Sequence, residues 1–398
     1  MSHYSRLTPL LCFCTFLAVV CLGVAVYAAD THGLLDPLLH GREVFEQNCI
    51  MCHGADAKGT GQLAAALPVR PANLTDCKLT AEDPVEVVQG IIRHGGPYAG
   101  RSSVMPAFGT VLSNSDIADA ARYVKSLCDD PDWVPGELNF PRPLITGKAF
   151  PEQEMIVGGR FGRNGKNVSE YLGILEYRVN GLTEIEIKSR ALSINPNIGP
   201  TESGLGDTVL SVKRVVAFSP LYRSLASAGV ELTLPTGSDR RGLGDGSFVF
   251  EPNLRAGVDW KQFVVQVAGA LAFPARTSNI NSEGKLDVAI GRYFFPDPRL
   301  QITPMIEFNT TVRLSGSSYG ETKSAIIPQV RVNWLVWSPG AGAQAPITRA
   351  RDFGVRPLLD LAYEYAFQPG LFMNICYLAQ FSRPGGLRSR THRDGIHQ

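Results

Sequence analysis

The sequence has no excess of charge of either sign. Its 398 residues include 38 Lys and Arg against 37 Asp and Glu, for a formal net charge of +1. The basic surplus that neutralises phosphates is missing, so the balance predicts no nucleic-acid partner. Charged residues make up only 19% of the chain, below the usual ~25%. Hydrophobic residues reach 44%, which excludes an intrinsically disordered chain.

Cysteine is also scarce, with eight residues in the whole chain, too few for a disulfide-stapled miniprotein. Three of them lie in the apolar run Leu10–Val26, which is followed by a small-residue site at Ala28. This pattern predicts a secretory signal peptide over residues 1–28. The alternative is an uncleaved anchor, because the run approaches the ~20 residues that span a bilayer. Export would place the other cysteines in an oxidising compartment.

The most specific motif is Cys49-Ile50-Met51-Cys52-His53. The spacing Cys-x-x-Cys-His lets two thiols attach to the two vinyl groups of one haem, and it leaves His53 to bind the iron as the proximal ligand. A zinc site would need a second Cys/His pair at ligand spacing, and a redox dithiol would need a βαβ context. The sequence offers neither. We therefore predict one haem c, bound covalently to Cys49 and Cys52.

Helix-forming segments flank this motif. Gly41 and Phe45 are four residues apart, so they share one face of a helix predicted just before it. A capping box is predicted at Ser113–Asp116, and apolar residues then recur at helical spacing through Leu127. The stretch Leu35–Cys128 resembles a class I cytochrome c, in which two terminal helices cross at such a glycine.

The resemblance implies an axial methionine in a Met-Pro loop. Met105 opens such a loop, 52 residues after His53, and a thioether is a soft ligand that raises the potential of haem iron. Met105 is therefore the predicted distal ligand, and His94 is its rival. The family also orients its proximal imidazole through a backbone carbonyl near a proline, and Pro68 and Pro71 are both candidates.

Further along, Asp129–Glu154 is rich in proline, which neither a helix nor a strand ladder tolerates. It is predicted to be a semi-rigid extended connector. Whether Cys77 and Cys128, both in the exported cytochrome segment, form a disulfide stays open. The predicted organisation is a signal peptide at 1–28, a cytochrome c domain at 29–130, a Pro-rich linker at 131–151, a β-barrel at 152–382 and a disordered basic tail at 383–398.

From about Tyr171 a period of two replaces the helical period. In Phe248–Trp260 and Leu300–Asn309, for example, every second residue is apolar, apart from a proline in each. A soluble β domain and a transmembrane barrel both give this alternation, but runs of about 9–13 residues fit a tilted membrane strand. We predict an antiparallel outer-membrane barrel of about twelve strands, including one strand at 322–337 and a last strand at 371–381.

Turn motifs in this region carry a second resemblance. They look like the outer-membrane transporter family named for meta-pathway phenol degradation, which is thought to form porin-like barrels. The resemblance covers about 155–381 and names no substrate. Ordinary turns are the alternative, since Gly and Asp punctuate any β protein. The motifs are Asn180–Glu186, Gly204–Asp207, Leu234–Gly237 and Gly242–Gly246.

A cytochrome joined to a barrel resembles the porin–cytochrome fusions of extracellular electron transfer. That resemblance implies a single-haem electron carrier at or across the outer membrane, with its cytochrome domain periplasmic or within the barrel. The partners it implies are redox proteins, or an extracellular electron donor or acceptor. No catalytic residue is predicted, although an outer-membrane metal-oxidase role stays open. The alternative is a transport barrel for a small apolar molecule, with the cytochrome as a redox accessory or sensor.

Overall fold

The computed structural model describes residues 35–364, with short gaps at 82, 129, 164–165, 197–199, 221, 261–262, 277–280, 298–299, 317, 335 and 351–352. The predicted signal peptide, the predicted strand at 371–381 and the basic tail lie outside these residues. Within the described part of the chain, no helix is both long enough and apolar enough to cross a membrane.

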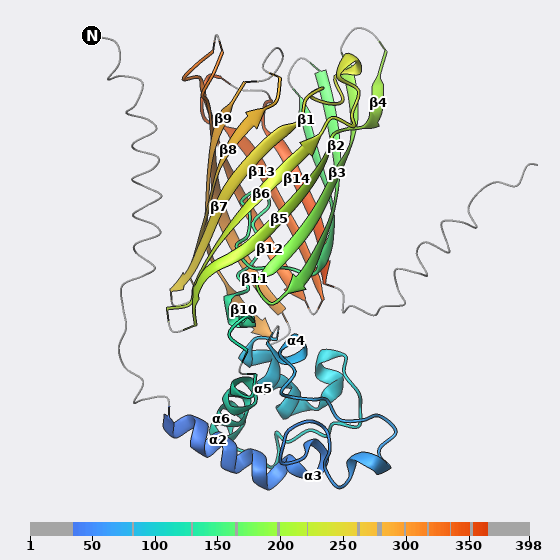
Figure 1. The fold of residues 1–398 in the computed structure, drawn as a ribbon, viewed down its shortest axis with the longest axis vertical. Helices are drawn as coiled ribbons and strands as arrows, with labels where there is room; N and C mark the ends of the chain where they lie inside the picture. Colours follow the sequence, from blue (N-terminus) through green and yellow to red (C-terminus); the bar gives the residue numbers. More distant parts are fainter. Residues whose placement is uncertain are drawn as a thin grey trace, which may run out of the picture. The chain divides into compact units, whose positions relative to one another are not determined.

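The first part of the chain is helical (Figure 1). Its α-helices are α2 (Leu35–Asn48), α3 (Ile50–His53), α4 (Cys77–Thr80), α5 (Val85–His94) and α6 (Asn114–Ser126), and its short 3₁₀ turns are η3 (Ala64–Ala66) and η4 (Gly96–Ala99). Helix α6 begins with the predicted capping box: the Ser113 hydroxyl accepts from the Asp116 amide at 3.1 Å, and the Asp116 carboxylate accepts from the Ser113 amide at 3.0 Å.

Helices α2 and α6 cross at Gly41, as the sequence predicts. A Cβ at Gly41 would lie 2.1 Å from the carbonyl oxygen of Asp119, so only glycine permits this approach. One turn further along, the rings of Phe45 and Tyr123 pack with their centroids 5.5 Å apart. The buried face of α6 then completes the core through Ile117 and its neighbours.

The second part is a closed antiparallel barrel of twelve long strands (Figure 1). The long strands are β1 (Glu154–Arg163), β2 (Lys166–Asn180), β3 (Thr183–Pro196), β5 (Thr208–Ser219), β6 (Ser224–Leu234), β7 (Val249–Trp260), β8 (Phe263–Pro274), β9 (Glu283–Arg292), β11 (Leu300–Arg313), β12 (Thr322–Trp334), β13 (Trp337–Pro346) and β14 (Arg356–Glu364). Two short strands, β4 (Glu202–Leu205) and β10 (Phe294–Asp297), pair with β3 and β11. Pairing of β1 with β14, in the register Val157 to Leu361, closes the cylinder.

The barrel is apolar outside and charged inside. Along β11, Ile306 and Phe308 are 45% and 41% exposed, whereas Glu307 between them is 0% exposed. On the neighbouring strand β12, Val330 is exposed and Arg331 is fully buried. A water-soluble β domain would bury the apolar face instead. This arrangement is therefore that of a transmembrane barrel, whose apolar face meets lipid.

One predicted strand is wrong in its bounds. The predicted strand at 322–337 runs too far: β12 ends at Trp334, and Trp337 already begins β13, which pairs with β12 and was not predicted at all. Its sequence, WSPGAGAQAP, lacks alternation because glycines occupy inward positions 340 and 342. The total of twelve is still correct, because the described barrel closes through β14 without the predicted strand at 371–381.

The Pro-rich segment does more than join the two parts. It has one 3₁₀ turn, η5 (Gly136–Leu138), and most of its residues from Val134 to Glu152 are buried. Several of its backbone groups bond to inward-facing side chains of the barrel. Sequence patterning predicted an extended connector and gave no sign that this segment lies in the lumen.

Candidate haem-binding site

The two motif cysteines lie on a single turn of chain. Cys49 directly precedes α3 and Cys52 lies within it, and both have free thiols. Three residues apart on a helical turn, their side chains lie on the same side. Burial raises the pKa of the Cys49 thiol to about 11, with the nearby Cys52 adding to the effect. This turn therefore presents two unpaired, adjacent thiols, as covalent attachment to one group requires.

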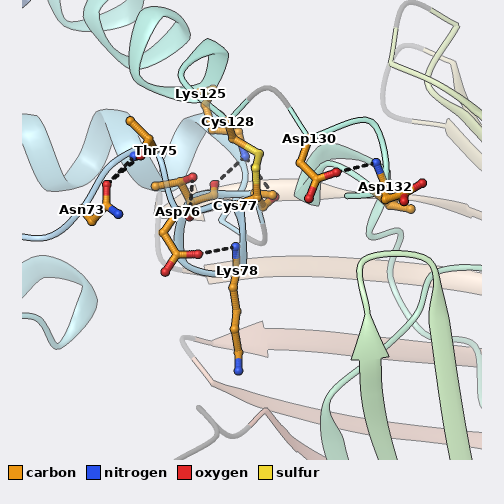
Figure 2. The surroundings of a disulfide bond; sticks show 12 residues. Asn73, Thr75, Asp76, Cys77, Lys78, Lys125, Cys128, Asp130 and Asp132 are labelled. Atoms are coloured by element: carbon orange, nitrogen blue, oxygen red, sulfur yellow. Dashed lines mark hydrogen bonds between the residues drawn. A yellow bond between two sulfur atoms is a disulfide. The ribbon is translucent and has the colours of Figure 1, made fainter. Parts of the chain in front are cut away.

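The other two cysteines of the domain are joined to each other. Cys77 and Cys128 form a disulfide with a Cα–Cα distance of 5.0 Å, which answers a question that the sequence left open (Figure 2). The bond fastens α4 to the end of α6. Lys125 reinforces the same junction, since its ammonium donates to the carbonyl oxygens of Thr80 and Ala81 at 2.9 and 3.0 Å.

The imidazole of His53 is oriented by a backbone carbonyl. Its Nδ1 lies 3.2 Å from the carbonyl oxygen of Ala72, the residue after Pro71. Of the two candidate prolines, Pro71 is thus the one beside the bond. With the proton on Nδ1, the lone pair is on Nε2, the nitrogen left for a metal. Burial lowers the pKa of His53, which favours the neutral, metal-binding form, although the bond to Ala72 acts in the opposite direction.

A glycine-dependent loop holds the Ala72 carbonyl in place. Gly59 has φ +71°, and a Cβ on it would lie 2.1 Å from the carbonyl oxygen of Pro71. The Gly59 amide donates to the carbonyl of His53 at 2.8 Å, and the Leu74 amide donates to the carbonyl of Ala57 at 2.8 Å. The loop after the motif therefore folds back against the turn that carries His53.

Met105 lies in a separate loop that is fastened to the end of α5. The Gly96 amide donates to the carbonyl of Met105 at 3.0 Å, and the Phe108 amide donates to the carbonyl of Ile92 at 2.9 Å. A Cβ at Gly96 would lie 2.0 Å from the carbonyl oxygen of Ser102, so only glycine fits at this position. The Met105 side chain is half-buried. The structure thus fixes the backbone that presents this thioether.

The two other histidines in the described part of the domain, His40 and His94, have partners of their own. His94 is exposed and its ring stacks on Tyr98, with the centroids 5.2 Å apart. His40 on α2 bonds to the Asp119 carboxylate on α6 at 2.9 Å, and this hydrogen bond raises the pKa of His40. His40 therefore links two helices. Because the His94 ring is stacked on Tyr98, we retain Met105 rather than His94 as the proposed distal ligand.

The donor set of this domain fits a haem c. Two free thiols, a neutral imidazole and a thioether are the groups that attach and ligate such a haem. Cys49, Cys52 and His53 come from one turn, and Met105 comes from a loop 52 residues beyond His53. When bound, the haem supplies reversible one-electron exchange at its iron.

Comparison with known proteins identifies the helical part of the chain. Residues 36–124 match the family described as "Cytochrome C oxidase, cbb3-type, subunit III". These residues form a cytochrome c domain. The domain is 37% identical over 90 residues to the cbb3-type cytochrome c oxidase subunit FixP of Azorhizobium caulinodans, a match that covers 22% of this chain and 28% of that protein. It is 29% identical over 99 residues to cytochrome c6 of a Synechocystis species, covering 25% of this chain and 72% of that protein.

Because the chain spans only 28% of the length of FixP, that likeness concerns the cytochrome domain alone. Two solved structures are similar to the barrel. The KdgM porin, at 12% identity and a TM-score of 0.36, covers 53% of this chain and 99% of that one. An outer-membrane channel of Pseudomonas putida F1, at 13% identity and a TM-score of 0.41, covers 57% and 100%. At such scores the likeness carries no argument, so the barrel assignment rests on its strand pairing and burial.

A second group of potential ligands lies inside the barrel. Carboxylate oxygens of Glu176, Glu184 and Glu186 lie within 4.8 Å of one another, and all three residues are buried. Each carboxylate already faces a cation: Glu176 pairs with Arg142, Glu184 with Lys213 and Glu186 with Lys188. These are ion pairs that satisfy buried charges, and we assign no metal to them.

Proposed function

We propose that the chain is a single-haem electron carrier that its barrel anchors in the outer membrane, with the haem domain on the periplasmic side. The sequence holds one Cys-x-x-Cys-His motif, Cys49–His53, and so provides for one covalently bound haem. The observation that carries the membrane anchor is the inverted burial of the barrel, in which Glu307 and Arg331 are fully buried while Ile306 and Phe308 are exposed.

The connections between strands support this orientation. At one mouth the turns are short: residues 181–182 join β2 to β3, and 335–336 join β12 to β13. At the other mouth all the connections but one (164–165, between β1 and β2) are longer, such as 235–248 between β6 and β7. In membrane barrels the short turns are periplasmic. Strand β1 begins at the short-turn mouth, because it runs antiparallel to β2, and β2 ends at the short turn 181–182. The chain that arrives from the cytochrome domain thus enters from the periplasm.

This orientation favours electron transfer at the membrane over transfer across it. The hydrocarbon core is ~30 Å thick, and electron-transfer rates fall steeply with distance. One haem on the periplasmic side would therefore exchange electrons with periplasmic redox proteins. The transport alternative is disfavoured, because residues 133–152 contact the lumen wall along their length.

Access of a reductant to the haem tests this proposal. A membrane-impermeant reductant added to intact cells is expected to leave the haem oxidised, and the same reductant should reduce it once the outer membrane is permeabilised. An absorbance spectrum of the haem before and after permeabilisation measures both states. Full reduction in intact cells would instead establish an electron path across the membrane and overturn the periplasmic proposal.

A further inference from the structure

Residues 133–152 run into the lumen from the short-turn mouth and return to it (Figure 1). The ascending part bonds through the Pro141 carbonyl, which accepts from the Gln266 side chain at 2.7 Å. The turn at 144–146 meets Glu307 midway along β11. The descending part bonds through the Phe150 carbonyl, which accepts from Lys213 at 2.8 Å.

The lumen wall is shaped to admit this segment. A Cβ at Gly257 on β7 would lie 2.7 Å from the ring of Phe140, and one at Gly342 on β13 would lie 2.8 Å from the Leu144 side chain. These strand positions are therefore glycine where the segment passes. The fit of wall to segment accounts for the glycines that hid β13 from sequence analysis, and it distinguishes a resident of the lumen from a chance linker.

Apolar packing fills the part of the lumen nearest the short-turn mouth. Val134, Leu138 and Phe150 of the segment form one buried cluster with wall residues that include Val215 and Leu225. The Arg178 guanidinium lies over the rings of Trp133 and Phe150, at 4.5 and 5.1 Å from their centroids. This packing places a dry core where an open porin would hold water.

The tip of the segment is held by one fully buried carboxylate. Glu307 accepts hydrogen bonds from the amides of Leu144 and Thr146 at 2.7 and 2.6 Å, and from the Thr146 hydroxyl at 2.6 Å. The Ile145 amide adds a contact at 3.1 Å, and the Gln329 side chain donates as well. A buried carboxylate without partners would be very unfavourable, and charge-assisted bonds are among the strongest that proteins make.

The segment is also fastened at both ends. Its last residues continue directly into β1. At the other end Glu137 accepts from the amide of Val85, the first residue of α5, at 2.9 Å, and it pairs with Lys125 at 3.6 Å. Loss of the Glu307 contacts would therefore free the tip without releasing the whole segment.

We propose that residues 133–152 are a resident plug that closes the barrel to solutes, and that Glu307 is the latch that holds its tip. The barrel is then a mount for the cytochrome domain, and it conducts solutes only when the plug is displaced from the lumen. This inference does not depend on the haem or on the direction of electron flow, so it can fail while the electron-carrier proposal stands.

Planar-bilayer conductance of the purified full chain tests the plug. The native protein is expected to stay closed. Glu307→Ala leaves the amides of Ile145 and Thr146 without their acceptor, and the Leu144 amide keeps only the Gln329 side chain at 3.1 Å, so this variant should show frequent ion-conducting openings. The matched control is Glu251→Ala, which removes another lumen carboxylate, whose partner is Lys285 at 2.6 Å, and it should stay closed. Heat-modifiable gel mobility verifies that each barrel is folded.

Labelling of the tip supplies a second measurement. The background for this measurement is Ile145→Cys, with Cys376→Ser to remove the one cysteine that follows Cys128 in the sequence. In it, Glu307→Ala should raise the rate of labelling by an impermeant maleimide about tenfold or more, because each hydrogen bond to a charged group contributes on that scale. Glu307→Gln keeps one acceptor oxygen and should give a smaller rise in the labelling rate. This variant replaces Glu307→Ala in the test if the alanine variant does not fold. Steady conductance by the native chain would overturn the plug. A folded latch variant that stays closed and labels at the native rate would overturn the role of Glu307.

Discussion

Replacing Cys49 and Cys52 together with alanine is expected to abolish covalent haem attachment, so that a haem stain of the denatured protein falls from one haem per chain to background. The two thiols are free and adjacent on one turn of chain, and each forms one thioether bond in the Cys-x-x-Cys-His arrangement. A single replacement should give an intermediate result, because the remaining thiol still binds the haem.

The matched control is the other cysteine pair of the same domain. Cys77→Ser with Cys128→Ser removes a disulfide that closes 51 residues of chain, so it should cost roughly 2–4 kcal/mol of unfolding free energy and leave the haem covalently attached. Denaturant unfolding followed by the haem stain separates the two effects. Full haem content in the Cys49/Cys52 double variant would contradict the proposed attachment site.

Replacing Met105 with alanine is expected to leave the haem attached but to change the coordination and the potential of its iron. Loss of the thioether opens the distal position, so the reduced protein should bind carbon monoxide readily. The reduction potential of the haem should fall by on the order of 0.1 V, which lies within the ~0.8 V over which axial ligands tune haem potentials. Spectroscopy of the reduced protein and a redox titration measure both changes.

Two variants control for this result. Met51→Ala removes the exposed methionine inside the attachment motif and should leave spectrum and potential unchanged. His94→Ala removes the exposed imidazole that stacks on Tyr98, and it too should leave the iron low-spin. If His94→Ala opened the iron to carbon monoxide and Met105→Ala did not, the distal ligand would be His94.

Local patterns predicted the elements whose determinants lie close together in the sequence. The spacing of Gly41 and Phe45 placed them on one helix face, and the resemblance to a class I cytochrome c then implied the α2–α6 crossing; the capping box followed from the spacing of Ser113 and Asp116. Strands such as β11 followed from alternation, and the structure decides which face is outside, since Glu307 is buried and Phe308 exposed. For the carbonyl that orients His53, the sequence left two candidate prolines, Pro68 and Pro71. It could not decide between them, because the answer depends on how the loop after the motif folds back.

The plug could not be predicted from the sequence, because it has no periodicity and its partners are remote. Thr146 bonds to Glu307, 161 residues away, and the Arg142 carbonyl accepts from Arg331, 189 residues away. The inward glycines of β13 likewise depend on remote contacts, because Gly342 lies beside Leu144 of the plug and Gly340 lies beside the Arg331 guanidinium.

Membrane fractionation combined with a haem stain tests the central claim, a cytochrome c domain anchored by its own transmembrane barrel, most directly. The full-length chain is expected in the outer-membrane fraction, where one band should carry both the covalent haem and the heat-modifiable mobility of a folded barrel. Haem found only in the soluble periplasmic fraction would contradict the anchored carrier.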